Sequence, residues 1–344
     1  MSIGTHDMTV IKESDIYRIL TPFGKATMKV ADACLYLSIE TGQRASLNRL
    51  KHALGGPIGF IAASEKPKIE WSGDITGPVP LDDMRILRVT EVLDITPRMR
   101  RITFQGEDLS RFDRPDQLHC RVIFQPKGAK ALEWPMMDDQ GNVMWPENCK
   151  LPTRVYTIRS IDTVRGELAM EFCRHENAGP ATQWAINATP GDIVAILGPA
   201  ADGPRPASFY VLVGDETGLP AISRILEHLD DNSRGMAIIE VAAPSEEREL
   251  KKPRGIAVRW LHRNGAEAGT TGLLRTAVQS IRWPTSLDEA FFWGGCEHNV
   301  FREIHDTIEK QVRLPCDRRV LYSHWHRHLS EEQIIAVGAE AYLP

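Results

Sequence analysis

Residues 154–159, with the sequence RVYTIR, gather side chains that suit a dinucleotide carrying an aromatic ring. Strand alternation places Arg154, Tyr156 and Ile158 on one face. Thr157 and Arg159 lie on the other face. Guanidinium groups bind phosphates, a tyrosine ring stacks on a ring system, and a hydroxyl group hydrogen-bonds its edge. The segment therefore predicts a dinucleotide site, and the alternative is an exposed strand with incidental arginines.

A second segment, residues 172–184, leads through a glycine-bearing loop into a helix. Gly179 and Pro180 come directly before the helical stretch. A helix N-terminus has unpaired N–H groups and the positive end of the helix dipole, which suit a diphosphate. The commoner reading is structural, with Thr182 as a plain N-cap and Pro180 as the first helical residue.

A third segment, residues 213–220, passes from a strand end into a helix, as the first turn of a dinucleotide-binding fold does. The G-x-G-x-x-G pattern is absent, and Asp215 and Glu216 would repel a phosphate. The segment does not predict a pyrophosphate cradle. It leaves Thr217 to face a ring or a ribose.

A fourth segment, residues 291–297, reads as a buried strand that runs into a turn at Gly294 and Gly295. Glycines at a strand end allow a ligand to approach the backbone closely, and a nicotinamide ring fits this description. The alternative is a tight turn after a core strand. Cys296 lies in this turn, so its exposure is expected to differ from that of the other cysteines.

His324, His326 and His328 share one face if their segment is a strand. No neighbouring carboxylate or H-E-x-x-H pattern completes a metal site, so we predict no metal and a partly exposed terminal segment. The nucleophile elbow, the P-loop and the CxxC motif are also missing. These absences disfavour a hydrolase, an ATPase and a thiol-redox protein.

The elements that must position these residues fall into three predicted domains, 1–80, 81–203 and 204–344. The first combines alternating strand patterns with one helical stretch, which predicts a small α/β domain. The second has short β-type runs separated by turn residues, which predicts an antiparallel barrel. In the third, apolar runs alternate with helical stretches, which predicts a doubly wound parallel sheet.

The composition narrows the class of protein further. The 344 residues carry a net charge of −5, so no global basic field attracts nucleic acid or anionic lipid. No stretch is long and apolar enough for a signal peptide or a membrane span, which predicts a cytoplasmic protein. Six scattered cysteines predict reduced thiols rather than disulfides or a zinc site.

Taken in order, these motifs resemble those of the siderophore-interacting proteins, a branch of the ferredoxin-reductase superfamily. The resemblance extends from about Met84 to His328 and includes W-L-H-R at residues 260–263. It implies a flavin-binding barrel followed by an NAD(P)-binding domain. Residues 1–80 resemble a small bacterial domain of unknown function. The chain departs from many members at Gly218, where they have alanine, and at His328, where they have glycine.

The resemblance implies contacts with FAD and with NADPH or NADH. The residues of the flavin half would be Arg154, Tyr156, Thr157, Ile158, Arg159, Phe172, His175, Gly179, Pro180, Ala181 and Thr182. Those at the nicotinamide side would be Asp215, Glu216, Thr217, Arg263, Gly294, Gly295 and Glu297. Arg154 and Arg159 would raise the flavin potential by favouring its anionic reduced form, and Arg263 would touch the adenosine half of the nicotinamide nucleotide.

The implied activity is transfer of electrons from NADPH or NADH through FAD to a ferric siderophore, with release of Fe(II) in the cytoplasm. Because ferric siderophores are often anionic, we expect a basic pocket formed by Lys127, Lys130 and Arg327. One alternative is a general flavin or quinone reductase. The other is a flavin-binding regulatory protein whose first domain contacts a partner.

Overall fold

A computed structural model of the protein describes residues 8–21, 23–32, 34–61, 68–128, 131–146, 151–174, 179–330 and 333–334. The chain divides into two compact units. The first comprises residues 1–84 and 128–151, and the second comprises residues 85–127 and 152–344. The predicted first domain, residues 1–80, did not include residues 128–151, which the structure groups with the N-terminal unit.

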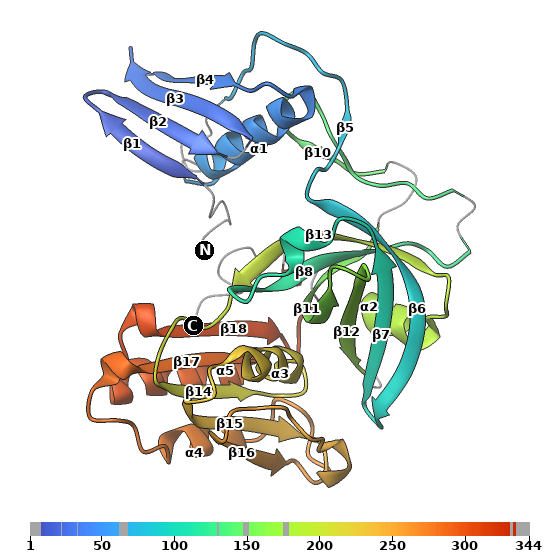
Figure 1. Ribbon diagram of the computed structural model, residues 1–344, viewed down its shortest axis with the longest axis vertical. Helices are drawn as coiled ribbons and strands as arrows, with labels where there is room; N and C mark the ends of the chain where they lie inside the picture. The colour runs from blue at the N-terminus through green and yellow to red at the C-terminus, as the bar shows by residue number, and fades with distance from the viewer. Residues whose placement is uncertain are drawn as a thin grey trace. The chain divides into compact units, whose positions relative to one another are not determined.

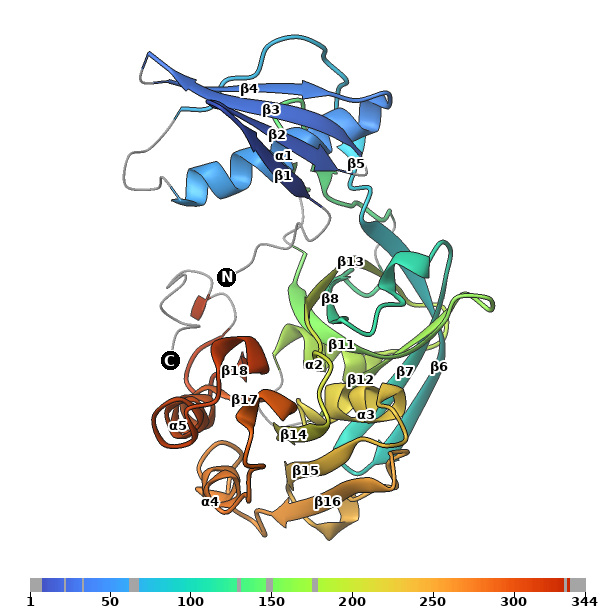
Figure 2. The ribbon, with the colours of Figure 1, turned by 60° about the vertical axis from the view of Figure 1, so that its left-hand side comes forward.

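The N-terminal unit is built on an antiparallel sheet with the order β1-β2-β3-β4. The strands are β1 (Thr9–Glu13), β2 (Ile16–Thr21), β3 (Gly24–Ala31) and β4 (Cys34–Glu40). Helix α1 (Arg44–Ile61) runs along this sheet (Figure 2). Ile19, Ala26 and Leu54 form the small core between them. The predicted small α/β domain is therefore present.

Residues 128–151 join this unit through a second, three-stranded sheet and through contacts with α1. The strands are β5 (Val79–Pro80), β9 (Met136–Met137) and β10 (Val143–Met144), in the order β10-β9-β5. Lys51 donates to the carbonyl oxygen of Asp139 at 2.8 Å. Asp139 accepts from the backbone N–H groups of Thr76 and Gly77 at 2.8 and 2.7 Å.

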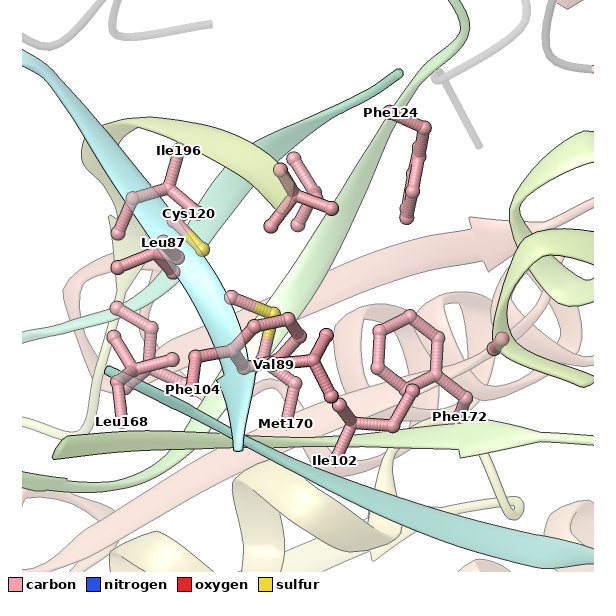
Figure 3. Packing of buried hydrophobic residues seen from close by; sticks show 14 of the residues in the cluster. Leu87, Val89, Ile102, Phe104, Cys120, Phe124, Leu168, Met170, Phe172 and Ile196 are labelled. Carbon is pink, nitrogen blue, oxygen red and sulfur yellow. The ribbon is translucent and has the colours of Figure 1, made fainter. Parts of the chain in front are cut away.

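The first part of the second unit is the predicted closed barrel, with the strand order β11-β12-β7-β6-β13-β8. Its strands are β6 (Met84–Thr96), β7 (Met99–Gly106), β8 (Gln117–Phe124), β11 (Thr153–Asp162), β12 (Glu167–Cys173) and β13 (Ile193–Asp202). Alternate side chains such as Val89, Phe104, Phe124, Met170 and Phe172 fill the interior (Figure 3). Helix α2 (Pro180–Asn187) interrupts the barrel strands where the sequence predicts a helix.

The rest of the second unit is a parallel sheet with the order β16-β15-β14-β17-β18 (Figure 1). Its strands are β14 (Phe209–Gly214), β15 (Arg234–Val241), β16 (Gly255–His262), β17 (Ala290–Glu297) and β18 (Arg319–Trp325). The main helices are α3 (Leu219–His228), α4 (Leu273–Gln279) and α5 (His298–Asp306). Short helical turns are η2 (Ser110–Phe112), η3 (Pro244–Glu246), η4 (Leu287–Glu289), η5 (Thr307–Val312) and η6 (Cys316–Arg318).

Helices cover both faces of this sheet, as predicted for a doubly wound fold. Leu219, Ile222 and Ile225 of α3 share a core cluster with Leu212 and Trp293. The helices α4 and α5 pack in a separate cluster that contains the alternate side chains of β14 and β17. The ends of β14 and β17 therefore meet between two helical layers, which is where such sheets bind ligands.

Of the three histidines in the 324–328 segment, His324 lies in a strand of the sheet, and His326 and His328 follow its end. Residues 319–325 form β18, which pairs in parallel with β17. The predicted partial exposure is confirmed, because the residues of β18 and His326 are half-buried and His328 is exposed, whereas the pairing of residues 319–325 with β17 was not predicted. Among the helices that the structure describes, none is long and apolar enough to cross a membrane.

Candidate functional site between the barrel and the parallel sheet

Strand β11 holds the predicted ring-stacking residue at the edge of the barrel core. Ile158 is fully buried in that core, and Tyr156 packs against it, so both lie on the predicted face. The ring of Tyr156 lies 4.4 Å from that of Phe172 and 6.4 Å from that of Phe124, measured between centroids. Because Phe172 is itself fully buried, it supports Tyr156 from within the barrel.

On the other face of β11, Arg159 is paired with carboxylates. Its guanidinium group lies 2.6 Å from Glu227 of α3 and 3.6 Å from Glu171 of β12. Glu171 is fully buried and also accepts from Arg101 and Arg248. The structure therefore directs Arg159 to the contact between the barrel and the parallel sheet, and carboxylates compensate the charge that was expected to act on a flavin.

The N-terminus of α2 presents its backbone as predicted, with Gly179 as the N-cap. Gly179 has extended backbone angles, Pro180 begins the helix, and no described side chain caps it. A β-carbon at Gly179 would lie more than 4 Å from every described neighbouring atom. Ala181 and Thr182 are buried inside the helix, so Thr182 is not the N-cap. This uncapped turn suits a diphosphate. His175 lies outside the described residues.

Asp215 joins the carboxyl ends of three parallel strands. Its Oδ1 accepts from the backbone N–H of Thr217 at 2.8 Å and from the Thr217 hydroxyl at 2.6 Å. Its Oδ2 accepts from the backbone N–H of Glu297 at 3.1 Å and from the indole N–H of Trp325 at 2.9 Å. Four donors therefore converge on one carboxylate, which fixes the loop after β14 against β17 and β18.

This arrangement determines which nitrogen of His324 carries the proton. The Thr217 hydroxyl gives its one hydrogen to Asp215, so the Nδ1 of His324, 3.2 Å from that hydroxyl oxygen, must be the donor. The Nε2 of His324 is then an acceptor, and it is buried without a hydrogen-bond partner among the described residues. The Thr217 hydroxyl thus binds Asp215 and His324 within the protein, whereas the sequence analysis expected it to face a ring or a ribose.

His119 on β8 connects this network to the flavin-strand candidate. Thr157 lies directly opposite His119 in the antiparallel pairing of β11 with β8. The His119 ring lies 5.4 Å from that of His324 at an interplanar angle of 76°. Neither His119 nitrogen has a hydrogen-bond partner within the described part of the chain. Burial lowers the pKa of His119 well below 6.5, and the positions of His324 and Arg224 lower it further.

Arg263 and Glu216, both predicted to contact a cofactor, bind each other instead. The two Nη atoms of Arg263 lie 2.9 and 2.5 Å from the Glu216 carboxylate oxygens. Glu240 lies 3.5 Å from Arg263 and accepts from Thr271 at 2.7 Å. Burial raises the pKa of the Glu240 carboxyl group. The pair thus forms a buried charge cluster at the ends of β15 and β16.

Gly294 and Gly295 lie within β17, so the expected Gly-Gly turn was wrong. β17 continues to Glu297, whose carboxylate caps α5 by accepting from the N–H of Asn299 at 2.7 Å. A β-carbon at Gly295 would overlap the His324 ring, so this glycine permits the close approach of β18. Cys296 is buried, and burial raises its thiol pKa well above 9. It is therefore not a reactive thiol.

The predicted basic residues contact different parts of the second unit. Lys127 contacts the carbonyl oxygen of Asn187 and lies 3.6 Å from Asp192. Arg327 forms an ion pair with Glu267. Lys130 lies outside the described residues.

The three histidines of the 324–328 segment do not form one cluster. His326 stacks on His298 with ring centroids 4.0 Å apart, whereas His324 faces His119. Across the described residues, no group of three His, Cys, Asp or Glu side chains could hold a metal ion. The structure thus offers an aromatic strand, an uncapped helix and buried histidines with unpaired nitrogens, which fit a ring system linked to a diphosphate.

Comparison with known proteins identifies the family to which this architecture belongs. Residues 88–203 match the model of the siderophore-interacting FAD-binding domain, and residues 207–328 match that of the siderophore-interacting protein. A siderophore utilization protein from T. fusca superimposes with a TM-score of 0.65 and 31% identity, over 75% of this chain and 97% of that chain.

Two relatives with functional names cover nearly the same region. Ferric vibriobactin reductase ViuB of Vibrio cholerae is 26% identical, over 72% of this chain and 91% of its own length. The NADPH-dependent ferric-chelate reductase of Escherichia coli is 29% identical, over 70% of this chain and 92% of its own length. The predicted resemblance and fold class are therefore confirmed. The chain belongs to the siderophore-interacting protein family, and its barrel is the FAD-binding domain of that family.

Proposed function

We propose that the protein is an FAD-dependent reductase that uses NADPH or NADH to reduce ferric siderophores and release Fe(II) in the cytoplasm. The observation that carries the proposal is the continuous contact between the candidate flavin strand and the ends of the parallel strands. Thr157 pairs with His119, whose ring contacts that of His324, and His324 donates to Thr217. A ring held on β11 would therefore lie next to the nicotinamide end of the sheet.

The residues that would hold FAD fall into two groups. Tyr156 and Thr157 would contact the ring system, with Phe172 behind Tyr156. Arg154 and the N-terminus of α2 at Gly179 would contact the diphosphate. FAD held by these residues would supply the redox chemistry that links a two-electron hydride donor to one-electron reduction of two ferric ions.

The nearby polar network would fix the geometry of the site. Asp215 is saturated by four donors, and the Thr217 hydroxyl is directed at it. His324 is held in one tautomer by Thr217, which leaves its Nε2 lone pair free of protein partners within the described residues. These residues would hold the ends of β14, β17 and β18 rigid while electrons pass.

Two further assignments follow from the family. The Escherichia coli relative is named as NADPH-dependent, which favours NADPH over NADH. The relative from Vibrio cholerae is named for a ferric siderophore, which favours an anionic ferric complex as substrate. We assign Lys127, Lys130 and Arg327 to substrate attraction, through their positive charge.

An anaerobic spectral titration tests the proposed function. The purified protein should show flavin bands that bleach on addition of NADPH and return on addition of a ferric catecholate siderophore with an Fe(II) trap. A protein that takes up no FAD would overturn the proposal. Faster turnover with a soluble quinone than with the ferric complex would instead indicate a general quinone reductase.

A pair of variants tests the location of the flavin. Combining Arg154→Ala with Tyr156→Ala should abolish retention of FAD, because phosphate contact and ring stacking are both lost. Val155→Ala is the matched control, since Val155 lies in the same strand with an exposed side chain. A double variant that retains a full complement of FAD would contradict the assignment.

A further inference from the structure

Arg224 on α3 is a buried cation at the contact between the parallel sheet and the barrel. Its side chain is only 2% exposed. Helix α3 begins immediately after the Asp215–Gly218 loop and packs against β11 of the barrel (Figure 1). Arg224 therefore lies on the element that links the proposed nicotinamide end of the sheet to the proposed flavin strand.

The guanidinium group of Arg224 binds backbone carbonyl oxygens of the barrel half. Nη1 donates to Ile158 at 2.9 Å and to Leu118 at 3.5 Å. Nη2 donates to Arg114 at 3.0 Å and to Phe112 at 3.5 Å. The register of β11 with β12 shifts between residues 158 and 160, so Arg224 binds the Ile158 carbonyl at an irregularity of the strand.

No carboxylate among the described residues lies within ion-pair distance of Arg224. Other arginines of the second unit differ in this respect, since the buried Arg263 pairs with Glu216 and the half-buried Arg159 pairs with Glu227. Burial lowers the pKa of Arg224, but a guanidinium group remains protonated in proteins. Arg224 thus contributes a positive charge that carbonyl dipoles solvate, and the carboxylate of Asp113 stabilises this charge without forming an ion pair with it.

An unpaired buried cation needs a reason beyond packing. Burying a charge costs free energy, and an apolar side chain of similar volume often replaces a buried charge without loss of stability. The carbonyl group that Arg224 binds most closely belongs to Ile158, the residue after Thr157 and two after Tyr156. The charge is therefore fixed beside the backbone of the residues proposed to hold the flavin ring.

We propose that Arg224 is a positioning residue of the reductase site, which fixes the backbone behind Tyr156 and Thr157 and favours the anionic reduced flavin through a positive charge that forms no ion pair with a described side chain. The inference rests on the proposed function. It assigns to Arg224 the electrostatic role that the sequence favoured for Arg159, because carboxylates compensate Arg159. Arg224 acts through the backbone and its field, and does not itself touch the reacting atoms.

Two substitutions separate the charge of Arg224 from its hydrogen bond. Arg224→Gln can still donate to the Ile158 carbonyl but is neutral, whereas Arg224→Lys retains the charge and loses the planar fork. The readout is the midpoint potential of bound FAD, measured with a reference dye, together with the FAD dissociation constant. Arg205→Gln is the matched control, because the exposed Arg205 side chain also donates to a backbone carbonyl oxygen, that of Asp317, in the same unit.

We expect Arg224→Gln to lower the equilibrium constant for two-electron reduction about tenfold, a magnitude expected for one charge acting over several ångströms in protein. A tenfold change corresponds to a potential about 30 mV lower. Arg224→Lys should change this constant by less than about twofold, a difference too small to reflect loss of a unit charge. Arg205→Gln should have the wild-type potential.

The outcomes distinguish this inference from the proposed function. A wild-type potential in Arg224→Gln, or equal losses in Arg224→Gln and Arg224→Lys, would overturn the inference while FAD binding and ferric reduction remain. If Arg224→Gln does not fold, a tenfold lower equilibrium constant for two-electron reduction in Arg224→Lys would by itself overturn the inference. Failure of the wild-type protein to bind FAD would overturn the proposed function itself.

Discussion

The hydroxyl group of Thr217 lies 2.6 Å from Oδ1 of Asp215 and donates its only hydrogen there. This hydrogen bond closes the loop after β14 on itself and leaves the threonine oxygen to accept from His324. The motif that in sequence suggests direct ligand contact thus acts as a clamp between the ends of the parallel strands. The free energy of this clamp is open to measurement.

Replacing Asp215 by asparagine should destabilise the protein. An amide group cannot accept at both of its terminal atoms, so the N–H groups of Trp325 and Glu297, or those at Thr217, would face an N–H group. We expect the free energy of unfolding to fall by roughly 1–3 kcal/mol, measured by urea denaturation. Asp231→Asn, at an exposed side chain, is the control. An unchanged free energy of unfolding would contradict the clamp.

Replacing Gly218 by alanine should also be destabilising, although many members of the family have alanine at this position. A β-carbon at Gly218 would overlap the carbonyl oxygen of Gly295 and approach Gly214 to 3.2 Å. Overpacking of this kind costs roughly 1–3 kcal/mol. The melting temperature of Gly218→Ala should therefore be lower than that of the wild type.

Gly56→Ala provides a control of the opposite sign. Gly56 lies in α1, and a β-carbon there would meet no described atom within 4 Å. Alanine favours a helix interior over glycine by up to about 1 kcal/mol. Gly56→Ala should leave the protein equally stable or more stable. For Gly218→Ala, a melting temperature at or above that of the wild type would contradict the prediction and show that β14 and β17 can separate.

Replacing Glu297 by alanine tests whether this residue serves the helix or the nucleotide. The carboxylate caps α5 through the N–H groups of Asn299 and Val300, and it also accepts from the N–H of Arg327. Loss of an N-cap costs about 0.5–2 kcal/mol, so urea unfolding should show a loss of that size. Glu303→Ala, on a partly exposed site of the same helix, should have a smaller effect.

The affinity for NADPH completes this test. If Glu297 is only a cap, the dissociation constant for NADPH should change by less than about threefold, which corresponds to less than about 0.7 kcal/mol. A tenfold loss of affinity with little loss of stability would restore the direct cofactor contact that the sequence predicts.

The stability of the protein should fall as the pH drops below 7, partly because of His119. Its folded-state pKa is lowered, first by burial and then by His324 and Arg224, whereas an unfolded histidine titrates near 6.5. Below about pH 6.5 the unfolded state binds a proton that folded His119 does not. The free energy of unfolding then decreases by at most about 1.4 kcal/mol per pH unit for this group.

His119→Phe should reduce this pH dependence, because phenylalanine keeps an aromatic ring at this position but has no nitrogen that titrates. Urea unfolding at pH 7, 6 and 5 should show a shallower decline than in the wild type. His328→Phe, at an exposed side chain, is the control and should keep the wild-type slope. Identical slopes for the wild type and His119→Phe would show that His119 does not titrate on unfolding.

The sequence alone predicts the architecture of the second unit, because its signals are local. Alternation at 154–159 places Tyr156 and Ile158 on the barrel face, and the stretch after Gly179 forms α2. Apolar runs separated by helical stretches produce the parallel sheet and its helices on both faces. The order of the motifs also predicts the family, which the comparisons confirm.

The partners of the charged site residues were decided only by the tertiary structure. Arg263 pairs with Glu216, 47 positions away, and Arg159 pairs with Glu227, 68 positions away. Strand periodicity tells which face a side chain occupies, but it cannot tell which carboxylate will lie opposite. The sequence analysis missed His119 and considered His324 only as a metal ligand for the same reason, since β8 and β18 meet only when the barrel packs on the sheet.

The places where local patterns failed have a common physical cause. Gly294 and Gly295 resemble a turn in sequence, but their missing β-carbons allow β18 to pair closely beside β17, so the strand continues. Residues 128–151 carry no strong periodicity, and contacts with α1 decide where they belong. The sequence by itself thus determined the secondary-structure elements and the family. Tertiary packing decided which charged side chains form ion pairs inside the fold, because pairing depends on distance in space and not on distance along the chain.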